Sequence, residues 1–305
     1  MISTQVGRAP RVGTASGERL RAAPRVVRGN GFAVAAAAFL ACMVVAAIFA
    51  EWVAPYDPMT IDVARAGQGP GTPGHLLGTD SLGRDELSRL IFGARISLTV
   101  GVLSVAGSVL IGVTLGLIAG YYRGFADWLI MRTVDLQMGL PSLLIALLAL
   151  YVLGPGILNV VLVLAITRWM VYARLVRGIM LSMRERQFFE GIVQLGASDA
   201  RVIIRHALPN VLRSVGVLAT LEMAMMMLLE ASLDFLGLGV QPPTASWGLM
   251  LSEGKNYMTT AWWQVTLPGI AIALTALSLN ILAARIGASG GRSGRRMPLP
   301  KASGV

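Results

Sequence analysis

Residues 96–121 read ISLTVGVLSVAGSVLIGVTLGLIAGY, a run of 26 residues without a charged side chain. A helix needs about 20 mainly apolar residues to cross the hydrocarbon core of a bilayer, so this segment is predicted to span a membrane. Inside it, Gly112, Gly116 and Gly120 recur every four residues. This spacing places small residues on one helix face and predicts close packing against a second helix.

The composition of the whole chain agrees with a membrane protein. Apolar residues make up 55% of the 305, and only 14% are charged, whereas soluble proteins average about 25% charged residues. The net charge of +10 is also compatible with nucleic-acid binding. Here, however, the basic residues lie between apolar runs and do not cluster on a polar fold, so no nucleic-acid partner is expected. The single cysteine, Cys42, excludes an intrachain disulfide.

Five further segments are long and apolar enough, or nearly so, to cross a membrane. The first has Arg-rich residues before it, as a signal peptide does, but its apolar run is too long and no clear cleavage site follows, so it is predicted to be retained. The predicted fold is all-α, with a transmembrane domain over 31–286. Tails 1–30 and 287–305 are rich in Arg, Gly, Ser, Ala and Pro and are predicted to be disordered. The six predicted spans are 31–53, 96–121, 128–153, 156–172, 211–233 and 263–284.

Lys and Arg residues accumulate on the cytoplasmic side of membrane proteins, which predicts the orientation of this chain. If the amino terminus is cytoplasmic, six spans place mainly the loops 54–95 and 234–262 on the extracytoplasmic side. Both termini and segment 173–210 are then predicted to be cytoplasmic. Of the 26 Lys and Arg residues, the outside loops keep only Arg65, Arg84, Arg89, Arg95 and Lys255.

Segment 173–210 is a basic, amphipathic interruption between apolar spans. Residues 184–195 place apolar side chains at helical spacing, and Gly196 is positioned to end that helix with a left-handed turn. Ser198 or Asp199 can cap a second helix over 199–207, which Pro209 is expected to stop. From the residues alone, this helix-turn-helix fits two interpretations equally well. It is a docking surface for a soluble partner, or an amphipathic element lying on lipid headgroups.

The same segment is similar to the EAA loop of permease subunits in bacterial ATP-binding-cassette (ABC) importers, in which Glu-Ala-Ala is followed after three residues by glycine. This chain has Glu190, then Gly191 and Ile192 in place of the two alanines, and then Gly196. The loop also ends on an apolar residue and proline, at 208–209.

Other motifs resemble the dipeptide/oligopeptide/nickel permease family, in its "C" type subunit. Residues 77–95, LGTDSLGRDELSRLIFGAR, are similar to the region that precedes the second span in that family. The resemblance extends over about 30–284. One departure is the segment after Asn280, which reads ILAAR and runs into a Gly/Ser/Arg tail, where the family usually has Gly-Asp-x-Leu-Arg-Asp. The other matching motifs are GPG at 154–156, YARLVR at 172–177, EASLDFLGLG at 230–239 and QPPTASWG at 241–248.

This resemblance implies a type I ABC importer permease fold and a set of partners. They are a second homologous permease subunit, cytoplasmic ABC ATPase subunits, an extracytoplasmic substrate-binding protein or lipoprotein, a di- or oligopeptide cargo and the lipids of a bacterial inner membrane. It also implies that segment 173–210 couples transport to the ATPase. The positions expected to carry the coupling are Phe188, Phe189, Glu190, Gly191, Gly196, Ala197 and Ser198.

Energy conversion is not expected in this chain, because a P-loop requires Gly-x4-Gly-Lys-Ser/Thr to hold phosphates. The one Gly-Lys pair, Gly254-Lys255, is followed by Asn256 and has Leu249 where the first glycine should stand. ATP and Mg²⁺ are therefore expected on partner subunits, with no cofactor or metal here. His75 and His206 are the only histidines and are predicted on opposite sides, which excludes a zinc-protease pair.

Charged residues inside membrane spans usually face a bundle interior or a water-filled cavity, which makes them candidates for the translocation path. They either line that path or bond to neighbouring helices. The methionines near them are adaptable, and such a group also suits ordinary packing. Two alternatives stay open for the function: a permease of this family that carries nickel, a haem-like compound or another small solute, and an ATP-independent channel or membrane scaffold. The path candidates are Asp135, Glu222, Glu230, Met223, Met226 and Met227.

Overall fold

The structure is a computed structural model, and it describes residues 30–185 and 196–293. Regular structure in these two ranges is helical, apart from two isolated β-bridges. The α-helices are α1 (Asn30–Ile48), α2 (Ala50–Val53), α3 (Glu86–Tyr122), α4 (Gly124–Met138), α5 (Ser142–Leu153), α6 (Ile157–Arg184), α8 (Asp199–Val202), α9 (Leu208–Phe235), α10 (Trp247–Gly254) and α11 (Trp263–Ser293). Short helical turns are η2 (Val63–Arg65), η3 (Ile203–Ala207) and η4 (Lys255–Tyr257).

By length and composition, five helical segments can cross a membrane, or six if the bent pair α4 and α5 forms one span. The prediction of an all-α polytopic membrane protein is confirmed. The predicted span 128–153 is not one straight helix, because α4 and α5 meet at a bend of 92°. Gly139, Leu140 and Pro141 lie at the break. Proline lacks the amide hydrogen that a helix needs and disfavours helical geometry in the residue before it.

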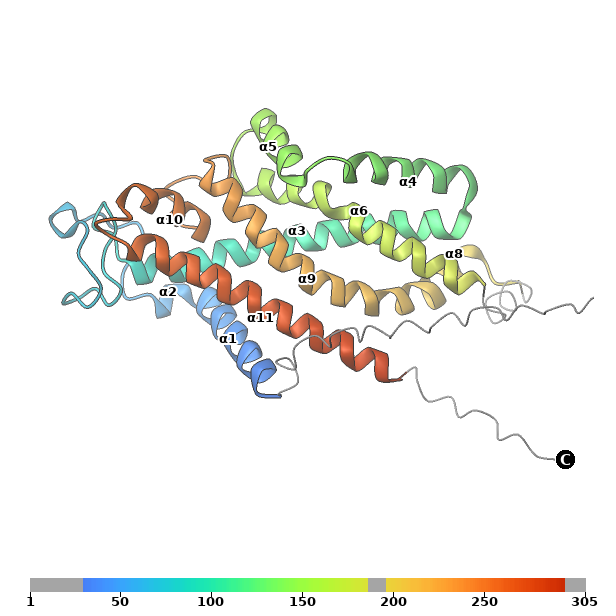
Figure 1. The fold of residues 1–305 in the computed structure, drawn as a ribbon, viewed down its shortest axis with the longest axis horizontal. Helices are drawn as coiled ribbons and strands as arrows, with labels where there is room; N and C mark the ends of the chain where they lie inside the picture. Colours follow the sequence, from blue (N-terminus) through green and yellow to red (C-terminus); the bar gives the residue numbers. More distant parts are fainter. Residues whose placement is uncertain (1–29, 186–195, 294–305) are drawn as a thin grey trace, which may run out of the picture.

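The long helices alternate in direction along the molecule, so that the connections collect at two ends (Figure 1). Segment 54–85 and α10 lie at one end, on the left of Figure 1, and α8 lies at the other. The α5–α6 turn belongs to the first end, since the amide of Gly156 donates to the carbonyl of Gly239 at 3.3 Å. The two long loops, which were predicted to lie on the same side, therefore lie at the same end of the bundle.

Several helices extend beyond their predicted spans. Helix α3 begins ten residues early, at Glu86, because the carboxylate of Asp85 caps it by accepting from the amide of Ser88 at 2.8 Å. Helix α6 continues to Arg184, and α11 runs to Ser293, into the tail predicted to be disordered from 287. A helix that is already nucleated extends at little cost per residue. Residues 1–29 and 294–305 of the predicted tails lie outside the described ranges.

The predicted stop at Pro209 is also wrong. Helix α8 continues through the π-helical turn η3 into α9, and residues 199–235 form one candidate span. Pro209 occupies the first turn of α9, where a missing amide hydrogen is tolerated. The wide turn before it carries a hydrogen bond from the Leu208 amide to the Ile203 carbonyl.

Helices α3 and α6 pack at very short range along the predicted glycine face. A methyl group added to Gly112 would lie 2.4 Å from the carbonyl oxygen of Trp169. At Gly116 and Gly120 the nearest atoms would be 2.7 Å and 2.6 Å away, on Ala173 and Met180. The prediction of close helix packing is confirmed for α3 and α6.

We expect Gly112→Ala to destabilise the protein, because the added methyl group must push α3 away from the α6 backbone, at a cost of about 1–3 kcal/mol. Gly216→Ala in α9 is the matched control, since its methyl group would meet no atom of the described residues within 4 Å. Alanine is the better helix former, so the control is expected to be neutral or stabilising. Thermal unfolding of the two purified variants in detergent measures the difference. Equal melting temperatures would contradict the packing described here.

Candidate functional site

One end of the bundle holds the described part of the predicted coupling segment. Gly196 has a φ of +80°, in the left-handed region that favours glycine, as predicted. Ser198 occupies the N-cap position of α8, but its side chain makes no capping hydrogen bond. Ala197 packs against an apolar cluster that includes Val202 and Met180. The other predicted coupling positions, Phe188, Phe189, Glu190 and Gly191, lie outside the described residues.

The middle of the bundle contains a buried ion pair between α6 and α9. The guanidinium of Arg168 donates to both carboxylate oxygens of Glu222, with N–O distances of 2.8 and 2.7 Å. The side chains are 15% and 8% exposed. Glu222 therefore bonds to a neighbouring helix, and the pair links α6 to α9. Arg168 was not predicted as the partner of Glu222, although the two charges lie in adjacent predicted spans.

The other path candidates occupy different surroundings. Glu230 is buried and accepts a hydrogen bond from the hydroxyl of Ser97 on α3, at 3.2 Å. Met226 and Met227 are buried in the apolar core, whereas Met223 is part of the lining of an apolar pocket of about 440 Å³ beside α1 and α3. Five of the six candidates thus pack inside the bundle or against a neighbouring helix.

Asp135 differs from these residues because it lies on the surface of the bundle. Its carboxylate pairs with Arg174 of α6, and the two side chains are 55% and 50% exposed. Leu129 and Leu136 on the same helix are also exposed. An exposed ion pair among apolar residues is costly against lipid, so this face is suited to contact with water or with another protein.

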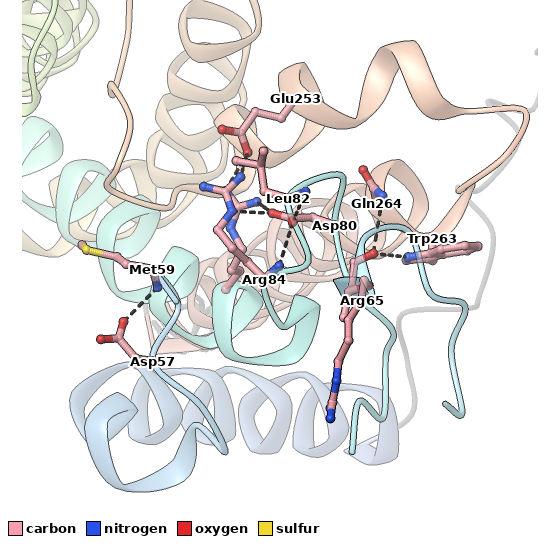
Figure 2. A network of polar contacts seen from close by, with 11 residues as sticks. Asp57, Met59, Arg65, Asp80, Leu82, Arg84, Glu253, Trp263 and Gln264 are labelled. Atoms are coloured by element: carbon pink, nitrogen blue, oxygen red, sulfur yellow. Dashed lines mark hydrogen bonds and ion pairs between the residues drawn. The ribbon is translucent and has the colours of Figure 1, made fainter. Parts of the chain in front are cut away.

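The opposite end of the molecule holds a charged network that joins the two long loops. Arg84 and Arg89 each bind both Asp80 and Glu253, and Figure 2 shows Asp80, Arg84 and Glu253 converging. The distances are 2.5 Å from Arg84 to Asp80, 2.9 Å from Arg84 to Glu253 and 2.7 Å from Arg89 to Glu253. The side chains of Asp80 and both arginines are at most 7% exposed.

Further hydrogen bonds hold the segments at this end of the bundle together as a cap. The indole of Trp263 donates to the carbonyl of Thr79 at 3.0 Å, and the side-chain amide of Gln264 approaches the same oxygen (Figure 2). Asp234 accepts from the amide of Val240 at 2.6 Å and from the hydroxyl of Ser246, which itself caps α10. These contacts join α3, α9, α10 and α11 at this end of the bundle, and the cap consists of segment 54–85 together with α10.

The described ranges hold no cluster of three or more His, Cys, Asp or Glu side chains arranged for a metal ion. His75 lies in the cap, where its ring contacts the carboxylate of Asp85 at 2.9 Å. His206 lies in η3, at the other end of the bundle.

Comparison with known proteins relates this sequence to components of transport systems. Residues 112–289 match the family model described as binding-protein-dependent transport system inner membrane component, and residues 20–70 match the N-terminal transmembrane domain of oligopeptide transport permease C. A solved structure described as an amino acid ABC transporter with histidines matches with a TM-score of 0.49 and 19% identity. The match covers 67% of this chain and 94% of that one.

Individual relatives are similar over most of their length. The glutathione transport system permease protein GsiD of Pectobacterium atrosepticum is 41% identical over 251 residues, which cover 82% of this chain and 83% of the relative. The di/tripeptide transport system permease protein DppC of Pseudomonas aeruginosa is 43% identical over 249 residues, covering 80% and 82%. GsiD of Escherichia coli is 43% identical over 259 residues, covering 85% of each chain.

Proposed function

The chain belongs to the family of binding-protein-dependent transport system inner membrane components, and from this premise we propose that it is a permease subunit of an ATP-driven importer for short peptides. The observation that carries the proposal is the identity of 41–43% to permeases named for glutathione and for di- and tripeptides. Glutathione and small peptides share peptide bonds and charged termini. The proposed cargo is therefore a short peptide, the class of compound to which the names of both relatives refer.

We propose that energy enters at the end of the bundle that holds Gly196 and α8, and that this end and both termini are cytoplasmic. Support comes from the Lys and Arg distribution and from the alternating helices, which place the α3–α4 connection, the end of α6 and α8 together at one end. A separate ATPase would bind ATP and Mg²⁺, since the sequence lacks a P-loop lysine motif. No cofactor is required in this chain.

The helix contacts suggest how movement would travel along the bundle. The glycine face locks α3 to α6, and the ion pair of Arg168 and Glu222 links α6 to α9. A displacement at the α8 end would therefore move these three helices together, in alternating access. The cap over 54–85 and α10 would receive cargo from an extracytoplasmic binding protein. The exposed pair of Asp135 and Arg174 would face the second permease or the water-filled path between the subunits.

Co-purification and a cargo panel test this function. The tagged chain is expected to recover a second permease and an ATPase from detergent extracts. Radiolabelled Ala-Ala, glutathione, Ni²⁺ and haem are then offered to proteoliposomes that contain the whole complex, its binding protein and ATP. Uptake of a short peptide is expected. Uptake of Ni²⁺ or haem alone would contradict the peptide cargo, and a lone chain that conducts solute without ATP would contradict the importer.

Gly196→Ala is expected to reduce peptide uptake per ATP hydrolysed while leaving membrane insertion intact. An alanine residue in the left-handed conformation is less stable than glycine there by about 1–2 kcal/mol. The backbone of the variant is therefore expected to adopt a different conformation at this turn. Among the described residues, no atom lies within 4 Å of the added methyl group, so the expected effect comes from the backbone conformation at this turn. Gly178→Ala on α6 is the matched control, because that position is equally open and helical. Wild-type coupling in Gly196→Ala would contradict the role of this turn.

A further inference from the structure

The residues on both sides of segment 186–195 contact the same side chain, Tyr121, near the end of α3. On one side, Arg184 donates to the backbone carbonyl of Tyr121, and its guanidinium lies over the tyrosine ring at 5.5 Å from the centroid. On the other side, the hydroxyl of Tyr121 donates to the carboxylate of Asp199 at 2.6 Å. One residue therefore contacts the last turn of α6 and the first turn of α8.

Tyr121 is itself held firmly in place. It is 8% exposed and packs in an apolar cluster with Met180 and Val202. The preceding residue, Gly120, lies against Met180, so this part of α3 cannot shift without moving α6. Packing therefore holds the tyrosine in place, and its contacts with Arg184 and Asp199 reach residues close to the predicted coupling segment.

The hydrogen bond to Asp199 is separable from the fold around it. Phenylalanine at 121 would keep the ring under Arg184 and the backbone carbonyl, and would remove only the hydroxyl. Helix α6 has an independent attachment nearby, because Arg177 binds both carboxylate oxygens of Asp127 on α4. Loss of the hydroxyl is therefore expected to remove the polar link between Asp199 and α3, while the apolar packing of Val202 against Tyr121 stays in place.

We propose that Tyr121 is a positioning residue that ties α8 to α3, so that movement of the ATPase-facing end is passed to the transmembrane helices. The proposal rests on the proposed function, since it assigns a role within ATP-driven transport. Within that function, the movement would pass through the contact between Tyr121 and Asp199.

The test uses the complete importer in proteoliposomes with its binding protein, and compares peptide uptake with ATP hydrolysis. Tyr121→Phe is expected to lower the number of peptides imported per ATP by about tenfold, the factor for loss of a hydrogen bond to a charged group. The melting temperature is expected to fall by only about 3–6 °C, the change that corresponds to the same free energy. Tyr122→Phe is the matched control, because Tyr122 is adjacent, is 55% exposed and keeps its ring contact with Tyr121 as phenylalanine.

A double-mutant cycle separates this contact from general effects. Asp199→Ala is expected to match Tyr121→Phe, and the double variant is expected to be no worse than either single one. Asp199→Asn keeps an acceptor for the hydroxyl and should retain more coupling than Asp199→Ala. Wild-type coupling in Tyr121→Phe, or losses that multiply in the double variant, would overturn the proposal. Absence of ATP-dependent peptide uptake in the wild-type complex would instead overturn the proposed function.

Discussion

Asp80→Ala is expected to lower the apparent melting temperature of the purified protein by about 10 °C. Asp80 contacts Arg84 and Arg89, whose side chains are only 7% and 2% exposed. Removing the aspartate leaves two buried guanidinium groups with Glu253 as their one remaining partner in this network. Breaking a buried ion pair from one side costs about 3–5 kcal/mol, and each kcal/mol lowers the melting temperature by about 2–4 °C in a chain of this general size.

The matched control lies in the same segment. Asp62 also pairs with an arginine, Arg65, but both side chains are about half exposed, at 48% and 49%. Asp62→Ala is expected to change the stability by less than about 1 kcal/mol, because water screens exposed ion pairs. Thermal scans of both variants in the same detergent make the comparison. If Asp80→Ala melts no lower than Asp62→Ala, the charged network is not what holds the cap together.

The second large effect is expected at Glu222. Glu222→Ala leaves Arg168 without its bidentate partner inside the bundle, which we expect to cost about 3–5 kcal/mol and to reduce the yield of folded protein. Asp135→Ala is the control, since its pair with Arg174 is about half exposed. The yield of monodisperse protein and the melting temperature measure both effects.

A compensating variant separates stability from function at this pair. Arg168→Met combined with Glu222→Leu removes both charges and replaces them with apolar side chains, a change that is often neutral or stabilising in buried sites. The double variant is expected to regain the melting temperature that Glu222→Ala loses. If it stays as unstable as the single variant, the ion pair is not the cause. Peptide uptake by the stable double variant then measures whether the charges themselves contribute to transport.

Local sequence patterns predicted much of this fold. Apolar length identified the spans, the spacing of Gly112, Gly116 and Gly120 identified a tight helix contact, and the turn at Gly196 was predicted from its place after an amphipathic stretch. Each of these features depends on residues close together in the chain. Helix ends were less accurate, because capping at Asp85 and the π-helical turn before Pro209 extend helices through polar residues.

The full charged network could not be predicted in the same way. Arg84 and Arg89 lie close to Asp80 in the chain, but Glu253 is 169 residues from Arg84, and nothing near it indicates that it joins these residues. The partner of Glu222 is likewise 54 residues away. Folding had to bring these charges together before their pairing could be recognised. The roles of the path candidates and of the coupling positions remain predictions.

Peptide uptake by membrane vesicles tests most directly whether this chain is a transport subunit driven by a separate ATPase. Vesicles carry the complete complex, or the same complex without this chain, and receive the binding protein, labelled peptide and ATP. We predict that peptide accumulates only when both this chain and hydrolysable ATP are present. Equal accumulation without the chain, or accumulation by the chain alone without ATP, would contradict this account.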